Sequence, residues 1–194
     1  DKIRSISNMA NIHFIWQKEM NGLGDAILHA KYHVGNEPFV ILLGDTVVRS
    51  NDGPITKQLI DVYEQHKSSV IALEEVKPEL VHRYGIIDGK AIAKNVYKAS
   101  DWIEKPSIEE APSNLAVASR YIFTPEIFDF LEKTLPGKND EIQLTDAMRE
   151  MVKYHPMFGM KFKGKRYDIG NKMGFLKTNI EFGLKDPEIG ESLK

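Results

Sequence analysis

The 194-residue sequence contains no cysteine, which excludes disulfides and thiolate zinc sites and fits a protein of the cytoplasm. No apolar run is long enough to span a bilayer, and no charged-then-apolar signal pattern opens the chain. The six histidines show no HExxH or other metal-ligand spacing. Internal repeats and low-complexity linkers are also lacking. These absences favour an ordinary globular protein.

Charge of one sign does not dominate the sequence. Its 26 Lys and Arg residues face 28 Asp and Glu residues, mixed along the chain, which gives a formal net charge of −2. A large basic face of the kind that attracts nucleic acid or anionic lipid is therefore not expected. Small-molecule partners are favoured instead. With 42% hydrophobic residues, a chain of this length can bury one substantial core, so we expect a single domain over residues 1–194.

Strands and helices alternate in the first half of the sequence. Residues 39–43 form an uninterrupted apolar run closed by Gly44 and Asp45, which is typical of a central strand buried on both faces of a parallel sheet. Asp25 is placed to cap a helix that precedes this strand. A helix lined by Ile55, Leu59 and other apolar residues follows, and then a strand at 69–73. This alternation predicts crossovers packed on a mostly parallel sheet.

The second half has a different pattern. Residues 84–98 indicate an antiparallel excursion with a turn at Gly89, and residues 115–123 indicate another strand. Helices are expected from Thr124 and Pro125, over 144–154, and finally along Met173, Leu176 and Ile180. An outer strand is expected over 158–162.

Two isolated carboxylates are candidate metal ligands. Asp45 stands at the carboxyl end of the expected central strand, where open α/β sheets place their ligands, and a carboxylate there suits Mg²⁺ held against phosphate oxygens. A turn or capping aspartate is the alternative. Asp168 precedes the last helix. Two carboxylates from distant segments can chelate one ion, but their spacing leaves open whether they meet.

A glycine pair and a glutamine suggest a nucleotide contact. Gly22 and Gly24 precede a helix, where glycines let the backbone approach a base or phosphate. Gln17 carries an amide that both donates and accepts, as pairing with the edge of a uracil ring requires. An ordinary loop-to-helix turn explains the same glycines equally well.

The sequence Glu104-Lys105-Pro106 combines a carboxylate suited to sugar hydroxyls with an ammonium that can neutralise phosphate charge. Proline stiffens the turn that presents them. Surface Glu–Lys pairs are common, so an ordinary surface pair remains the alternative.

Taken in chain order, these segments resemble the bacterial-type UTP:glucose-1-phosphate uridylyltransferases, within the sugar nucleotidyltransferases. The resemblance covers residues 13–182, and the sequences DEIQLTDA and YDIG carry most of its specificity. The segments that carry it are residues 17–24, 43–45, 83–87, 104–106, 112–116, 140–147 and 163–170. It implies a Rossmann-like, mixed and mainly parallel α/β sheet flanked by helices, of the nucleotide-diphospho-sugar transferase type.

The resemblance implies a Mg²⁺-dependent transfer from UTP to glucose 1-phosphate that yields UDP-glucose and pyrophosphate. Gln17 and the Gly22 backbone would read the uracil. Asp45 and Asp168 would share the Mg²⁺ that bridges the nucleotide and sugar phosphates, which makes Asp45 a catalytic residue. Residues 140–146 would be structural or interfacial. Similar enzymes form dimers or tetramers, so a homo-oligomer is expected.

For the sugar, the resemblance assigns Gly85, Glu104, Asn114 and Val117 to the glucose. Lys105 would lie against the phosphate of glucose 1-phosphate and act in catalysis.

The sequence also departs from the family. Its first strand and the Gly-rich loop that cradles the UTP phosphates are not found, so the fold is expected to be N-terminally incomplete and the isolated chain inactive. Trp16 replaces an expected basic residue, and Asp25 stands where relatives often have His. Two alternatives stay open: a related enzyme using dTTP or CTP, and a non-catalytic sugar-nucleotide sensor or assembly partner.

Overall fold

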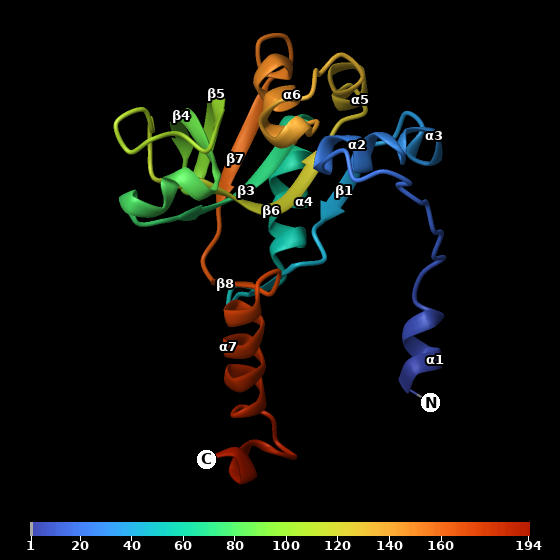
Figure 1. The fold of residues 1–194 in the computed structure, drawn as a ribbon, viewed down its shortest axis with the longest axis vertical. Coiled ribbons are helices and arrows are strands. Elements are labelled where there is room, and N and C mark those ends of the chain that lie inside the picture. The colour runs from blue at the N-terminus through green and yellow to red at the C-terminus, as the bar shows by residue number, and fades with distance from the viewer. Residues whose placement is uncertain (1) are drawn as a thin grey trace.

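The computed structural model describes residues 2–194, which form a mixed α/β fold (Figure 1). The strands are β1 (Phe39–Leu42), β2 (Thr46–Arg49), β3 (Ser69–Glu75), β4 (Gly85–Ala93), β5 (Val96–Glu104), β6 (Leu115–Phe123), β7 (Met157–Lys161) and β8 (Lys165–Asp168). The helices are α1 (Lys2–Ser7), α2 (Leu23–Leu28), α3 (Lys31–Val34), α4 (Ile55–His66), α5 (Ile127–Leu131), α6 (Leu144–Met151) and α7 (Lys172–Gly183). Short 3₁₀ helices cover Pro78–Arg83, Lys138–Asp140 and Gly190–Leu193.

Six strands form the main sheet in the order β1-β6-β3-β7-β5-β4, and β2 pairs with β8 in a separate ribbon. Among the described strands of the main sheet, only β3 and β7 pair in parallel. The mixed α/β class is confirmed, but the expectation of mainly parallel pairing is wrong. The reason is β6, which runs antiparallel between β1 and β3 and so separates two strands that share one direction.

Helices cover both faces of this sheet. Along β3, Val70 and Ala72 pack with α4 on one face, while Ile71 and Leu73 pack with α2, α5 and α6 on the other. All four side chains are fully buried. The predicted strand at 69–73 is therefore confirmed, and its continuous apolar run reflects burial on both faces.

The strand at 39–43 is different from its prediction. It was expected to be central, but β1 is the last strand of the described sheet and pairs only with β6. Val40 and Leu42 remain 39% and 55% exposed, while the alternate residues Phe39 and Ile41 pack against the core. An apolar run encodes a tendency to be buried, but it does not specify how many neighbouring strands bury it.

The predictions for the second half are largely confirmed. β4 and β5 form an antiparallel hairpin, and β6 occupies residues 115–123 as expected. α6 begins at Leu144 as predicted but ends at Met151, three residues early. The strand expected at 158–162 is β7, an inner strand of the sheet between β3 and β5, so its assignment as an outer strand is wrong.

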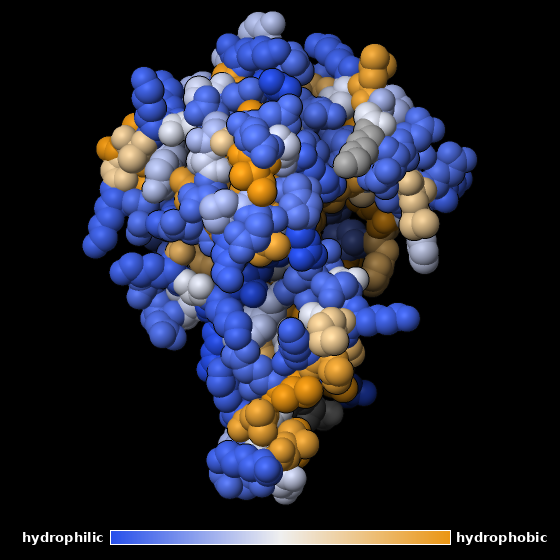
Figure 2. Space-filling model, turned by 60° about the vertical axis from the view of Figure 1, so that its left-hand side comes forward, coloured by the Kyte–Doolittle hydropathy of each residue, from blue (hydrophilic) through white to orange (hydrophobic). Residues whose placement is uncertain are grey.

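The last helix projects away from the sheet as a stalk (Figure 1). α7 has no buried residue, and Met173, Leu176 and Ile180 are each more than half exposed. Figure 2 shows apolar side chains gathered along this narrow part of the molecule. The predicted helix is confirmed, while its expected inner face has no cover among residues 2–194. None of the described helices combines the length and apolar character that crossing a membrane requires.

Candidate active site

Asp45 and Asp168 are far apart in the sequence, yet they lie side by side in the structure. Strand pairing places Thr46 opposite Asp168, and the Ile169 N–H donates to the Asp45 carbonyl at 2.8 Å. A methyl group on Gly170 would lie 3.2 Å from Asp45 Oδ2 and 3.4 Å from Asp168 Oδ1. The two carboxylates therefore border one space.

The chemistry of this pair fits a divalent cation. Asp45 Oδ1 accepts a hydrogen bond from Thr46 Oγ1 at 3.2 Å, and Asp168 Oδ1 accepts one from the Gly170 N–H at 3.0 Å. Within the part of the chain that the structure describes, no third acidic or histidine side chain completes a cluster. Mg²⁺ is commonly held by one or two carboxylates together with water and substrate phosphates, which matches two carboxylates.

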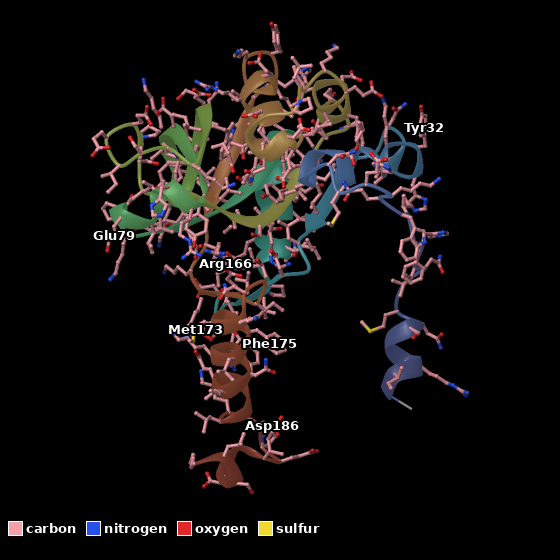
Figure 3. All side chains as sticks on the ribbon, in the orientation of Figure 1. Tyr32, Glu79, Arg166, Met173, Phe175 and Asp186 are labelled. Atoms are coloured by element: carbon pink, nitrogen blue, oxygen red, sulfur yellow. The ribbon has the colours of Figure 1, made fainter. Side chains whose placement is uncertain are left out.

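A charged pair ties the ribbon that carries Asp168 to the main sheet. Arg166 on β8 forms an ion pair with Glu74 on β3, and its guanidinium lies 5.0 Å from the centre of the Tyr84 ring. In Figure 3, Arg166 lies where the stalk meets the sheet. The Arg166 side chain is 10% exposed, so this contact is shielded from solvent and holds β8 in place.

The predicted sugar residues meet on the β4–β5 hairpin. Gly85 pairs directly with Glu104, and Gly85 is buried. Lys105 Nζ lies 2.8 Å from Glu104 Oε1, and the Lys105 N–H donates to the Tyr84 carbonyl at 3.0 Å. Lys105 has a φ of 47°, a strained conformation for a residue with a side chain. The hairpin thus presents a carboxylate and an ammonium together.

The other two sugar candidates diverge. Ile86 pairs with Ala116, so the following position on β6, Val117, lies beside Gly85. Asn114 instead donates its amide to Glu75 Oε1 at 3.2 Å. Val117 therefore lies next to the Gly85–Glu104 pair. The Asn114 amide instead binds Glu75 at the end of β3.

The nucleotide candidates form a compact loop. Gln17 Nε2 donates to the Gly22 carbonyl at 3.1 Å and to Asp25 Oδ2 at 2.7 Å. Asp25 was expected to cap the helix, but it lies within the first turn of α2 and instead orients Gln17. This arrangement leaves the Gln17 carbonyl oxygen as the acceptor for a ligand.

Two features of this loop require a glycine at position 22. Its φ is 99°, and a methyl group there would lie 2.8 Å from Glu141 Cβ. The backbone of Ile142 hydrogen-bonds on both sides, to the Asn21 carbonyl and from the Gly24 N–H. The 140–146 segment therefore supports the loop that carries the nucleotide candidates.

Tyr121 was missed by the sequence analysis. It lies on β6 between Ile41 and Ile71 and is 5% exposed. Burial, followed by the negative charges of Glu104 and Asp45, raises the pKa of its phenol, which therefore stays protonated as a donor. The negative charges of one sugar candidate, Glu104, and one metal candidate, Asp45, thus act on the same buried phenol. Alternation along β6 marks Tyr121 as a core residue, and nothing in the sequence distinguishes it further.

A cavity of about 770 Å³ runs beside α7 and borders Asp168 and Tyr84. Asp45, Glu104 and Lys105 do not line it. A ligand held between Asp45 and Glu104 would therefore lie beside this cavity and not within it.

Known proteins are similar to this chain in sequence and fold. Residues 1–182 match the nucleotidyl transferase family. The chain is 49% identical over 194 residues to the UTP–glucose-1-phosphate uridylyltransferase of Staphylococcus epidermidis, covering 100% of this chain and 67% of that protein. It is 49% identical over 188 residues to UTP–glucose-1-phosphate uridylyltransferase 2 of Streptococcus pyogenes, covering 95% and 63%.

A solved structure agrees with these matches. The crystal structure of UDP-glucose pyrophosphorylase complexed with UDP-glucose has a TM-score of 0.91 and 44% identity, covering 95% of this chain and 70% of that chain. The chain thus spans about two thirds of the length of these relatives. From this identity and coverage, the chain belongs to the nucleotidyl transferase family, among the UTP–glucose-1-phosphate uridylyltransferases.

Proposed function

We propose that the protein transfers the uridylyl group of UTP to glucose 1-phosphate and releases pyrophosphate, forming UDP-glucose. The supporting observation is that the carboxylates of Asp45 and Asp168, which are far apart in the sequence, border one space. Relatives at 49% identity bear the name of this activity. The proposal concerns the full-length protein, because the chain spans about two thirds of those relatives.

Positioning and charge neutralisation would carry the reaction. A phosphate oxygen of glucose 1-phosphate attacks the α-phosphorus of UTP in line; the new P–O bond forms as the bond to the β-phosphate breaks. Lys105 holds the sugar phosphate, and Asp45 and Asp168 would hold Mg²⁺. When bound, Mg²⁺ supplies positive charge that stabilises the phosphate oxygens.

Separate elements of the fold would bind the two substrates. The Gln17 carbonyl oxygen would accept the uracil N3–H, and the Gly22 backbone would pack against the base. Glu104 and Val117 would contact the glucose beside Gly85. Asn114 belongs to this sugar set by resemblance; one amide N–H is donated to Glu75, and its second N–H and its carbonyl oxygen would contact the sugar.

A nucleotide comparison tests the function. Full-length protein is incubated with glucose 1-phosphate, Mg²⁺ and either UTP, dTTP or CTP, and pyrophosphate release is measured. We expect UTP to give the highest kcat/KM. Highest activity with dTTP or CTP would favour the related enzymes, and no pyrophosphate with any nucleotide would favour a non-catalytic sugar-nucleotide sensor.

We also propose a homo-oligomer that works in the cytoplasm. The exposed apolar face of α7 supports the first part, because monomeric proteins rarely leave large contiguous apolar patches uncovered. Light scattering of the full-length protein after size-exclusion chromatography tests the assembly. A monomer at micromolar concentration would contradict it.

A further inference from the structure

The first turn of α6 reaches the proposed sugar site. A methyl group on Gly85 would lie 3.0 Å from Thr145 Oγ1 and 3.3 Å from Glu104 Oε2. The hydroxyl and the carboxylate oxygen therefore border the same small space above Gly85. The hydroxyl comes from α6 and the carboxylate from β5, and these two elements meet at the start of β4.

These two polar atoms have unused hydrogen-bonding capacity. Lys105 pairs with Glu104 through the other carboxylate oxygen, Oε1, at 2.8 Å, which leaves Oε2 toward Gly85. Across the described residues, the Thr145 side chain has no hydrogen-bond partner. A hydroxyl can donate and accept, and a carboxylate accepts. Side by side, they complement two neighbouring hydroxyl groups.

Thr145 is held rigidly in this position. Its neighbours in α6, Leu144 and Ala147, are 4% and 0% exposed and belong to the core beneath the helix. Trp102, two residues before Glu104, belongs to the same core and is fully buried. Because both elements are fixed by packing, the two polar side chains are positioned before a ligand binds, as selective recognition requires.

The electrostatics around this turn agree with the geometry. Burial, followed by the negative charge of Glu104, raises the pKa of Asp146, the residue after Thr145. The charge of Glu104 is thus felt on this turn of α6. A neutral hydroxyl at position 145 can face that carboxylate and share a ligand with it, whereas a second carboxylate there would repel it.

We propose that Thr145 is a specificity-determining residue that binds the hexose together with Glu104. The Thr145 hydroxyl and Glu104 Oε2 bind two adjacent hydroxyl groups of the sugar over Gly85. This inference rests on the proposed transfer to glucose 1-phosphate and deepens it. The 140–146 segment then has two roles, supporting the nucleotide loop through Ile142 and reading the sugar through Thr145.

The test replaces Thr145 in the full-length protein with valine, which removes the hydroxyl at nearly constant shape, or with serine, which keeps it. Kinetic constants are measured for UTP, glucose 1-phosphate and its 2-, 3-, 4- and 6-deoxy analogues. For Thr145→Val we expect KM for glucose 1-phosphate to rise about tenfold, the scale of one neutral hydrogen bond, with little change in KM for UTP. Thr145→Ser should stay close to wild type.

The deoxy analogues identify the contact. With one of them, wild type should lose about tenfold in kcat/KM, and Thr145→Val should lose nothing further, because the same hydrogen bond is already missing. Thr134→Val is the matched control. Its hydroxyl bonds the Phe130 carbonyl at the end of α5, away from Gly85, and its removal should leave every sugar constant unchanged.

Two results overturn the inference. An active wild type whose Thr145→Val variant keeps normal sugar constants, or loses equally with every analogue, removes Thr145 from sugar recognition and leaves the proposed function intact. A wild type that makes no UDP-glucose overturns both. Circular dichroism and thermal melting establish that the variants fold; should Thr145→Val be unfolded, a Thr145→Ala variant with normal sugar constants overturns the inference in the same way.

Discussion

The two halves of the candidate site are built differently. The sugar half lies on the β4–β5 hairpin, where buried residues such as Gly85 and Trp102 hold Glu104 in place. The carboxylate half lies on a two-stranded ribbon and the start of the stalk, where Asp45 is exposed and α7 buries nothing. Packing thus fixes the sugar half, whereas Asp45 and Asp168 are positioned by only a few specific contacts. Substitutions in the two halves should therefore affect activity and stability to different extents.

The largest effect is expected for the two carboxylates, of which Asp45 is exposed and Asp168 is half-buried. In the full-length protein, Asp45→Asn or Asp168→Asn should lower kcat by roughly 10³-fold, since a charge-stabilising contact made in the transition state is lost. The melting temperature should hardly change, because neither side chain supports the core. Steady-state kinetics with saturating Mg²⁺ and a thermal melt check both points. Near-wild-type turnover in either variant would refute the metal assignment.

Lys105→Ala should have the next largest effect, a fall of about 10²-fold in kcat/KM for glucose 1-phosphate. Its ammonium lies beside Glu104 and would neutralise the sugar phosphate. Lys94→Ala is a matched control in the exposed turn of the same hairpin. Equal kinetics for the two variants would reduce Lys105 to a surface lysine.

Breaking the ion pair that ties the carboxylate half to β3 of the main sheet should cost stability. Glu74→Ala leaves Arg166 without its partner in a shielded position, and we expect about 3 kcal/mol less unfolding free energy, the low end for a broken buried pair because Glu74 is 21% exposed. Urea unfolding measures it. The double variant Glu74→Leu/Arg166→Met should recover most of the loss. A Glu74→Ala variant as stable as wild type would show that the ribbon is held by other contacts.

A smaller effect is expected where the nucleotide loop is oriented. Asp25→Ala removes the acceptor of the Gln17 amide, so KM for UTP should rise several-fold, the scale of one charged hydrogen bond partly replaced by water, while KM for glucose 1-phosphate stays constant. Parallel measurement of both constants is the check. A change confined to the sugar constant would place Asp25 outside nucleotide binding.

The smallest effect concerns the stalk. Hydrogen bonds from Lys165, Tyr167 and Lys185 lower the pKa of Glu181 to about 2. Since the unfolded value is about 4.3, Glu181 stabilises the fold above that pH and loses its effect as pH falls toward 2. Glu181→Gln should therefore melt slightly lower than wild type at pH 7, and the difference should shrink below about pH 4. A difference that is independent of pH would contradict this assignment.

The sequence predicted which elements form the core better than it predicted the order and direction of the strands. The apolar run of β3 and the spacing of α4 specify burial directly, and both elements appear where expected. The position of β1 at the end of the described sheet was not predictable, because strand order depends on long-range pairing. The same limit explains the mistaken parallel sheet: local patterns carry no information on the direction of β6 relative to its neighbours.

The site shows a similar division. Asp45, Asp168, Glu104 and Lys105 were selected by residue type and resemblance, but the approach of the two aspartates required the β2–β8 pairing. Thr145 escaped attention because a threonine in the first turn of a helix is unremarkable in sequence. Its significance arises only from its place above Gly85.

The central claim is that Asp45 and Asp168 hold one divalent ion beside the bound sugar nucleotide. Electron paramagnetic resonance of Mn²⁺ titrated into the full-length protein with UDP-glucose tests it most directly. Wild type should bind one Mn²⁺ per chain in the presence of UDP-glucose, and both Asp45→Asn and Asp168→Asn should weaken that binding about tenfold or more, as loss of a first ligand or its support does. Unchanged Mn²⁺ affinity in both variants would contradict the claim.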